Sequence, residues 1–480
     1  MPDSLKPSNR RSRWAAFGPG LLFAGAAIGV SHLVQSTRGG AEFGMSAALV
    51  VVVSCLIKWP AFRFGPLYAS ATGNSLLDGY RRQGRGTLVI FGLVTLAVCF
   101  TTLAAVTVVT AGLLLNLLPG LKTWVGSLGL PGEGGLDVIW VSGGLLGLVG
   151  LGLLTGGYRL LERVMKVVMP VLALCTVVSA GLAISRIAPE SWTAMPPVEE
   201  SSARSLLAAI IGWMPAPIDI AVWSSLWTLA KVRSTGRRSS VRSVVLDFDA
   251  GYLSTLVLAV GFVILGASVM HGSGIEFSNQ APEFGRQIVD LYAAQLGEWT
   301  RPMIAVAAFL AMLSTTVTVA DGFPRATAAL VASFFGPVRP TRETRVDGMI
   351  PRIMQEVIDR SLTSEPDGEN EPAPGAGSES ERGSEGGILA YWISFLGIAA
   401  GAIWILVKVV PADFKRLIDL VTITSFLVAP VLVLFNHLCV TGREMPISLR
   451  PNVVWRAWSW VCFAATLGLA LVYVTLLLVD

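Results

Sequence analysis

Long apolar stretches recur along the whole chain, and short polar segments separate them. A helix of about 20 apolar residues is long enough to cross the hydrocarbon core of a bilayer. On this basis the pattern predicts about eleven membrane spans, near residues 18–43, 45–63, 87–116, 137–155, 160–185, 204–230, 248–270, 301–330, 388–408, 414–438 and 453–478. Residues 65–85 are too polar to span a membrane and predict a surface helix with a loop.

The composition agrees with a membrane protein. Of the 480 residues, 53% are hydrophobic and only 14% are charged, and the mean hydropathy is +0.65. Soluble domains do not have such a composition. The first apolar run has no A-x-A-like cleavage site and further spans follow it, so it is not typical of a cleavable signal peptide. The five cysteines are scattered without C-x-x-C spacing, which favours small apolar fillers.

Basic residues predict the orientation of the chain. Loops rich in Lys and Arg stay in the cytoplasm, so we expect a multi-pass protein of the plasma (inner) membrane with a cytoplasmic N-terminus and with Asp480 outside. The basic residues precede the first span and then recur in alternate loops: Lys6, Arg10, Arg11, Arg13, Arg63, Arg81, Arg82, Arg85, Arg159, Arg163, Lys166, Lys231, Arg233, Arg237, Arg238 and Arg242.

One polar segment interrupts the second half of the chain. Residues 363–387, TSEPDGENEPAPGAGSESERGSEGG, contain almost no apolar side chains. Such a segment cannot bury enough surface to fold, so we expect a disordered cytoplasmic loop within an insertion near 335–387. It is interpreted as a passive spacer, with a regulatory role as the alternative.

The first span carries polar residues at membrane depth. In AGAAIGVSHLVQS (24–36), Gly29 is followed by His32 and Gln35. An ionisable side chain inside a membrane is costly and is a candidate functional residue. We predict that the helix breaks at Gly29, and that backbone carbonyl groups there face a substrate: those near Ile28, Gly29 and Val30.

The sixth span is interrupted in a similar way. In IIGWMPAPIDIAVWSS (210–225), Pro215 and Pro217 follow Gly212, and Asp219 comes just after them. Proline removes a backbone donor and disrupts a helix. If spans one to five and six to ten form two halves, both interruptions fall in the first span of a half. This pattern is typical of secondary transporters with inverted repeats. Ordinary helix kinks are the simpler alternative.

Several motifs resemble those of the Nramp divalent metal transporters. GPGLLFAGAAIGVSH…GGAEFG is similar to their opening segment, and TAGLLLNLL and TGGYRLLERV are similar to segments near their third and fifth spans. WMP stands where they have Met-Pro-His, and STTVTVADG resembles their eighth span. The resemblance implies an all-α membrane protein of the LeuT-type fold with broken helices 1 and 6. It divides the chain into a cytoplasmic tail, two inverted five-helix repeats and an additional C-terminal helix, at 1–17, 18–186, 203–438 and 453–480.

The departures from the family are also informative. Gly29 and His32 stand where Nramp proteins bind metal with the Asp and Asn of DPGN, whereas Met214 keeps the thioether. An acidic pair of span three, which is linked to proton movement in the family, is replaced by uncharged residues. The resemblance therefore implies an Nramp-like scaffold in which the usual metal and proton chemistry is largely absent; the remaining replaced positions are Ala104, Thr107, Ala216 and Thr422.

The remaining side chains offer an incomplete metal site. Imidazole, thioether and carboxylate together suit an ion such as Mn²⁺ or Fe²⁺, and His32, Met214 and Asp219 supply one of each. Simpler interpretations are a histidine bound to a carbonyl or to Gln35, a packed methionine and a helix-capping aspartate. The further substrate-binding candidates are Ile28, Gly29, Val30, Ser31, Gln35 and Ile211.

Hydroxyl groups recur along the eighth span and are candidates for a coupling-ion site. In LeuT-type folds such hydroxyls help to hold sodium, although hydrogen bonding between helices is the simpler interpretation. The candidates are Thr315, Thr316, Thr318 and Asp321.

These features support three hypotheses. The first is a divalent metal cation transporter with a remodelled site and weak or no proton coupling. The second is a transporter of a non-metal small solute, with sodium coupling as an option. The third, a sensor, is supported only by the insertion. Walker, G-x-S-x-G and H-E-x-x-H motifs are missing, so we expect neither enzyme activity nor a cofactor. The expected partners are a small cation or solute and the lipid bilayer, and not a nucleic acid.

Overall fold

The computed structural model describes residues 18–127, 136–236, 238–274, 278, 280–337, 377–409 and 414–479. The regular structure in these residues is helical, and ten helical segments are long and apolar enough to cross a membrane. Two shorter helices, α10 and α11, lie on either side of a break and form a further crossing. The prediction of an all-α protein with about eleven spans is therefore confirmed within the described residues.

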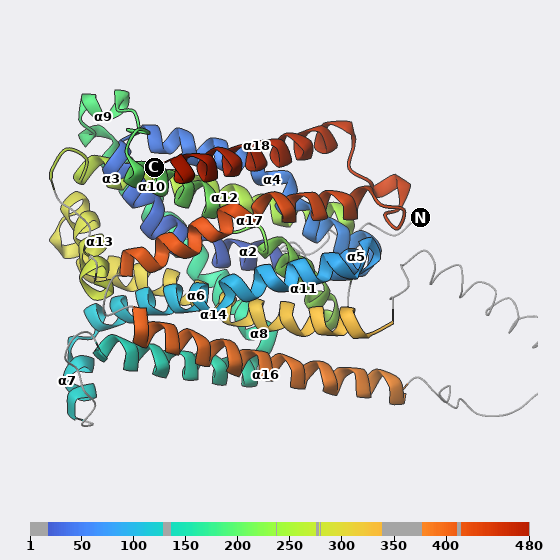
Figure 1. The fold of residues 1–480 in the computed structure, drawn as a ribbon. Helices are drawn as coiled ribbons and strands as arrows, with labels where there is room; N and C mark the ends of the chain where they lie inside the picture. Colours follow the sequence, from blue (N-terminus) through green and yellow to red (C-terminus); the bar gives the residue numbers. More distant parts are fainter. Residues whose placement is uncertain are drawn as a thin grey trace, which may run out of the picture.

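The helices pack side by side in one bundle (Figure 1). We call the end of the bundle that carries α5 the α5 face, and the end that carries α3, α9 and α13 the α3 face. In chain order the helices are α2 (Pro19–Ala27), η1 (Val30–Ser36), α3 (Thr37–Phe43), α4 (Ser46–Thr72), α5 (Leu76–Gln83), α6 (Arg85–Leu117), α7 (Pro119–Ser127), α8 (Leu136–Ala183), η3 (Ile184–Arg186), α9 (Pro189–Thr193), α10 (Ser201–Trp213), α11 (Ile220–Thr235), α12 (Val241–Val269), α13 (Ala281–Leu296), η4 (Glu298–Thr300), α14 (Arg301–Phe335), α16 (Gly377–Val409), α17 (Phe414–Thr441), η5 (Ile447–Leu449) and α18 (Val453–Val479).

The polar segment 65–85 differs from its prediction as a surface helix. Helix α4 continues to Thr72, and the side chains of α5 from Leu76 to Tyr80 are buried. The polar residues of this segment are used internally. Ser75 accepts a hydrogen bond from the backbone N–H of Asp78 (3.3 Å), and the Asp78 carboxylate accepts one from the backbone N–H of Ser75 (2.9 Å). This reciprocal cap satisfies the helix start without water.

The predicted spans 137–155 and 160–185 both lie in α8, which the structure assigns as one helix. The chain nevertheless bends sharply between them. A Cβ atom added to Gly152 would lie 3.8 Å from the Leu160 side chain, whereas eight residues of straight helix rise about 12 Å. The two apolar segments therefore remain separate crossings.

The prediction of a disordered loop at 363–387 is wrong for its last residues. Helix α16 begins at Gly377, well before the predicted span 388–408. A helix that is already formed adds further turns easily. The other residues of that predicted loop lie outside the described part of the chain.

Helix α12 is in backbone contact with both halves of the first span. A Cβ atom on Gly251 would lie 2.2 Å from the carbonyl oxygen of Gly20 in α2, and one on Gly266 would lie 2.1 Å from that of Thr37 in α3. Such close approach needs glycine at the contact. The two glycines therefore set the position of the first span against α12.

We expect Gly251→Ala to lower the free energy of unfolding by about 1–3 kcal/mol, because overpacking at a tight contact forces the helices apart. Gly147→Ala is the matched control, since a Cβ atom there has no neighbour within 4 Å. Denaturant unfolding of purified protein in mixed micelles measures both changes. Equal stability of the two variants would contradict the assigned contact.

Candidate functional site

The first span is broken where the sequence predicts it. Helix α2 ends at Ala27, Ile28 and Gly29 are not helical, and the chain continues as the π-helix η1 into α3. The break leaves carbonyl groups without their usual helical partners. The Thr315 hydroxyl lies 2.9 Å from the carbonyl oxygen of Gly25 and 3.1 Å from that of Ile28, and it donates to one of them.

The break and α14 are in direct contact. A Cβ atom added to Gly29 would lie 2.4 Å from the hydroxyl oxygen of Thr315. Only a residue without a side chain allows α14 to approach the non-helical backbone so closely. Gly29 and Thr315 therefore belong to one structural unit.

The sixth span is broken at the predicted prolines. Helix α10 ends at Trp213 and α11 begins at Ile220. In a continuous helix the residue at position 215 would donate its N–H to the carbonyl of Ile211, but Pro215 has none. The buried Lys58 of α4 replaces this donor, with its Nζ 2.6 Å from the carbonyl oxygen of Ile211 and 3.3 Å from that of Gly212. The positive charge of Lys58 also interacts favourably with the negative end of the helix dipole at this C-terminus.

Lys58 is a site residue that our sequence analysis missed. Its side chain is 2% exposed, in the middle of an apolar span. The available signal was its charge, because a lone lysine inside a membrane helix is a candidate functional residue by default. Its partner was not predictable, because Ile211 lies more than 150 residues away and contributes only a backbone oxygen.

The two breaks face each other. The Ser31 hydroxyl lies 3.3 Å from the carbonyl oxygen of Pro215, and the Ser36 hydroxyl lies 3.6 Å from the Met214 sulfur. Between the breaks is a cavity of about 20 Å³, enough for about one water molecule. It is lined by Ala26, Ala27, Val30, Ser31, Thr102, Val106, Trp213, Pro217, Ile220, Trp223, Thr315 and Val319. The two interruptions that the sequence predicts therefore lie next to each other in the structure.

Polar contacts close the bundle on both sides of this cavity. Toward the α3 face, Arg38 makes a two-pronged ion pair with Asp419 of α17 (2.7 and 3.3 Å), and Gln35 lies against the same carboxylate (3.4 Å). Toward the α5 face, the Asp247 carboxylate of α12 accepts the backbone N–H of Gly20 at 2.9 Å, at the start of α2. The first span is therefore held at both of its ends.

His32 makes hydrogen bonds through both ring nitrogens. Nε2 lies 2.9 Å from the carbonyl oxygen of Thr255 in α12, which only accepts, so we place the ring hydrogen on Nε2. Nδ1 lies 2.7 Å from the Ser31 hydroxyl, which also lies 2.5 Å from the carbonyl oxygen of Ala27, so the two acceptors share one hydroxyl hydrogen. This is the simpler interpretation offered by the sequence, with Thr255 as the carbonyl partner. In this arrangement neither nitrogen is open to a metal ion.

Met214 and Asp219 lie in separate surroundings. The Met214 sulfur meets Ser36, whereas one carboxylate oxygen of Asp219, Oδ1, is buried without a hydrogen-bond partner. Asp219 precedes α11 but makes no side-chain cap bond to it. Within the described residues no group of three or more His, Cys, Asp or Glu side chains is arranged to hold a metal ion. The trio His32, Met214 and Asp219 stays a prediction.

Other predicted residues also have defined places. Ile28 contributes its carbonyl to Thr315, and Val30 lines the cavity. Ile211 contributes its carbonyl to Lys58, and its side chain packs with Phe426 away from the cavity. Thr422 accepts a hydrogen bond from the Gln35 amide at 3.4 Å.

Of the coupling-ion candidates, Thr315 alone lines the cavity. Thr316 pairs with the Thr110 hydroxyl of α6 (2.8 Å), and Thr318 bonds to backbone carbonyls of its own helix. Asp321 is ion-paired with Arg325 and also accepts hydrogen bonds from Trp227 and Tyr391. These contacts match the simpler interpretation of hydrogen bonding within and between helices.

The chain has the LeuT-type fold of membrane transporters. A variant of the Eremococcus coleocola manganese transporter matches with a TM-score of 0.60 at 13% identity, over 98% of this chain and 88% of that chain. MhsT in complex with L-phenylalanine matches with a TM-score of 0.55 at 14% identity, over 98% and 99%. The nucleobase-cation-symport-1 family transporter Mhp1 matches with 0.51 at 14% identity, over 98% and 95%. These likenesses establish the fold.

Sequence comparison identifies a relative. The chain is 36% identical over 330 residues to a protein of Pasteurella multocida (strain Pm70) called uncharacterized protein PM0681, covering 68% of this chain and 72% of that protein. The chain therefore belongs to the same family as that protein. No model of a known protein family matches the chain.

A second relative has a named activity. The divalent metal cation transporter MntH of Brucella suis biovar 1 (strain 1330) is 27% identical over 277 residues, 56% of this chain and 57% of that protein. This likeness supports the Nramp-like character of the sequence. The named relative and the similar structures are transporters, which agrees with a protein that is not an enzyme.

We expect Lys58→Met to destabilise the protein by about 1–3 kcal/mol, because it leaves the buried carbonyls of Ile211 and Gly212 without a donor. Lys408→Met, at an exposed lysine near the end of α16, is the matched control and is expected to be neutral. Denaturant unfolding in mixed micelles measures both. A Lys58→Met variant as stable as the control would show that Lys58 does not support the break.

Proposed function

We propose that this protein is a secondary transporter that carries a small inorganic cation between the two broken helices. The observation that supports the proposal most strongly is the small cavity between the two breaks, which Ser31 of the first and Pro217 of the second both line. Non-helical backbone is tolerated at membrane depth where it is buried or lines a cavity, and transporters place their substrate there. A space of about 20 Å³ suits an ion better than an organic solute.

The cargo that we favour is a divalent metal ion. The likeness to MntH supports this choice. Most of the lining residues are apolar, and the polar groups among them are oxygen ligands, namely the Ser31, Thr102 and Thr315 hydroxyls, with the backbone carbonyls of the first break nearby. Oxygen donors suit hard ions such as Mg²⁺ and Mn²⁺ more than soft ones. Met214 would add one weak ligand, and His32 would join only after it leaves Thr255.

A divalent cargo also needs a negative charge, and Asp219 is the candidate. Its Oδ1 atom is buried without a hydrogen-bond partner, and it lies at the end of the second break. A carboxylate in this state gains most from a nearby cation, because an unpaired buried charge is costly. We infer that Asp219 turns toward the ion when the cavity opens.

Proton coupling through the third span is expected to be weak or absent. The positions that are acidic in Nramp proteins hold Ala104 and Thr107 here, and the Thr107 hydroxyl bonds to the carbonyl of Leu103 (2.6 Å). Neither side chain carries a proton charge near neutral pH. The replaced positions thus support transport without a proton route in α6.

A non-metal solute with sodium coupling is the second candidate function. The observation that favours it is the neutral oxygen group made by Thr315 and the carbonyls of Gly25 and Ile28. Such a group suits a monovalent cation as well as a hydroxyl hydrogen bond. This candidate predicts that uptake of the solute requires sodium and does not respond to Mn²⁺.

For the metal proposal we expect Asp219→Asn to weaken Mn²⁺ uptake by more than about tenfold in proteoliposomes, and Met214→Ala to weaken it by less, because loss of charge beside a dication costs more than loss of a weak ligand. Calorimetry with Mn²⁺, Mg²⁺ and Ca²⁺ checks the same order for binding. If none of these divalent ions binds even at millimolar concentration, the metal proposal is wrong and the second candidate function is favoured.

We also expect Asp419→Asn to raise the rate at which a water-soluble thiol reagent labels a Ser31→Cys variant. The rate should be several-fold higher than in the Ser31→Cys variant that keeps Asp419. The reason is that Arg38 then loses its two-pronged partner on α17 and the α3 face opens more often. Asp290→Asn, an acid of α13 outside this contact, is the control. If labelling is unchanged by Asp419→Asn, the Arg38–Asp419 pair does not close the site.

A further inference from the structure

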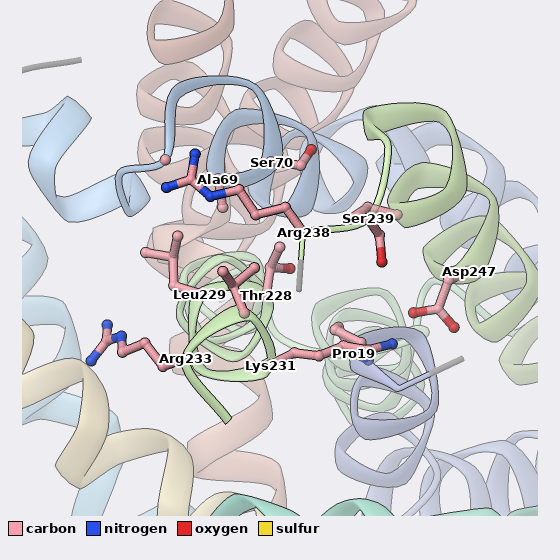
Figure 2. Close-up of a pocket in the computed structure, with 13 residues that line it drawn as sticks. Pro19, Ala69, Ser70, Thr228, Leu229, Lys231, Arg233, Arg238, Ser239 and Asp247 are labelled. Carbon is pink, nitrogen blue, oxygen red and sulfur yellow. The ribbon is translucent and has the colours of Figure 1, made fainter. Parts of the chain in front are cut away.

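Helix α11 lines two separate cavities. At its start, Ile220 and Trp223 border the small cavity between the two breaks. Near its other end, Thr228 and Lys231 border a larger cavity of about 270 Å³, which we call the α5-face cavity (Figure 2). The start of α2, the end of α4 and the start of α12 complete its walls. Along α11 the two cavities are close, because the five residues from Trp223 to Thr228 rise only about 7.5 Å.

The charged groups beside the α5-face cavity compensate one another. The Lys231 ammonium group interacts with the carboxylates of Asp247 and Glu162, and Asp247 also accepts the backbone N–H of Gly20 at 2.9 Å. Figure 2 shows Arg233 turned away from the cavity. Paired charges keep the space polar without making it a strong cation site, which suits an entrance through which ions pass.

Two tryptophans occupy the face of α11 between the cavities. Ile220, Trp223, Trp227 and Lys231 are spaced by three or four residues, so they follow one face of the helix. This face runs from the small cavity to the α5-face cavity. Trp223 and Trp227 are 1% and 0% exposed, and their rings meet edge to face with centroids 6.1 Å apart. The two indole rings therefore fill the space that separates the cavities along this face.

Trp223 fits closely against α14. A Cβ atom added to Gly322 would lie 2.4 Å from the Trp223 ring, and the Phe323 ring meets it edge to face at 4.7 Å between centroids. Helix α14 ends against α5, where the Ser333 hydroxyl lies 3.4 Å from the Asp78 carboxylate. Gly322 and Phe323 follow the cavity-lining part of α14 in that direction, so the Trp223 ring covers the small cavity toward the α5 face.

Asp321 holds the second tryptophan. Its Oδ2 atom accepts hydrogen bonds from Nε1 of Trp227 (2.9 Å) and Nε of Arg325 (2.9 Å). Its Oδ1 atom accepts from Nη2 of Arg325 (2.6 Å) and from the Tyr391 hydroxyl (3.0 Å). Hydrogen bonds to an ionised group are strong, above all when the group is buried. Asp321 therefore ties α11 to α14 and α16 one turn beyond Trp223.

We propose that the transport route to the α5 face runs along this face of α11, with Trp223 as its gate and Asp321 as the positioning residue that keeps the gate shut through Trp227. The inference rests on the proposed transport function. Release of Trp227 from Asp321 lets α11 move away from α14, and the Trp223 ring then leaves Gly322. Because about one helical turn separates the cavities, a small shift of α11 connects them.

The test measures from which side a membrane-impermeant thiol reagent reaches the small cavity. Ser31→Cys places a thiol in that cavity, and inside-out and right-side-out vesicles expose opposite faces of the protein. Ser70→Cys, at the α5-face cavity, identifies the vesicles that expose the α5 face. Mass spectrometry of the labelled peptide separates these thiols from the native cysteines. Mn²⁺ uptake by the same vesicles is a separate readout, so a failure of the transport proposal is distinguishable from a failure of the gate.

In vesicles that expose the α5 face, we expect Trp223→Ala to raise the labelling rate of Ser31→Cys at least about tenfold, because the open form becomes more populated. Trp227→Phe keeps an aromatic ring but loses the N–H that Asp321 accepts, and it should raise the rate several-fold. Trp404→Phe, at an exposed tryptophan of α16, is the matched control and should leave the rate unchanged. In vesicles of the opposite orientation, all three variants should label at the original rate.

Two results would overturn the proposal. Labelling in Trp223→Ala that stays at the original rate, or rises equally from both sides, would show that Trp223 is not a gate toward the α5 face. Labelling in Trp227→Phe that matches Trp404→Phe would show that Asp321 does not hold the gate. Because Trp227→Phe is the milder change, it decides the question even if Trp223→Ala does not fold.

Discussion

A backbone carbonyl that loses its helical partner at membrane depth must find another hydrogen-bond donor. This constraint explains the hydrogen bonds that neighbouring helices make at the two breaks. At the first break, the Thr315 hydroxyl of α14 lies within hydrogen-bond distance of the carbonyls of Gly25 and Ile28 and donates to one of them. At the second break, the ammonium group of Lys58 serves the carbonyls of Ile211 and Gly212. The eighth and second spans are thus tied to the breaks by the polar groups that the breaks create.

The first span is also held from another side by α12. The glycine contacts at Gly251 and Gly266 position its two halves, and the His32 bond to Thr255 fixes the stretch between them. The irregular backbone is therefore enclosed between α12 and α14. This enclosure explains why a titratable ring is present in an apolar span, since His32 supplies the donor that ties the π-helical turn to its neighbour.

Local sequence signals predicted the features whose causes are local. Apolar length predicted the spans, and glycine and proline predicted both breaks, because those residues change the backbone where they stand. The resemblance to Nramp proteins implied the LeuT-type fold, which the structural comparisons confirm. Features that depend on distant partners were not predictable. The burial of α5 depends on helices that come later in the chain, and the role of Lys58 depends on a backbone atom of α10.

The candidate site was predicted only in part for the same reason. Ser31 and Val30 line the cavity because they follow the break directly, and their part in binding stays a prediction. The choice of His32 as a metal ligand rested on its residue type, and sequence alone did not show that Thr255 and Ser31 take both ring nitrogens. Asp219 lies beside the second break, and its unpartnered oxygen is visible only in the folded structure.

The central claim is that the cargo binds between the two breaks. The most direct test is a crystal structure of the protein soaked in Mn²⁺, with anomalous diffraction recorded at the manganese edge. The account predicts an anomalous peak in the cavity lined by Ser31 and Pro217, with Asp219 turned toward it. A peak elsewhere with this cavity unoccupied, or no peak at millimolar Mn²⁺, would contradict it.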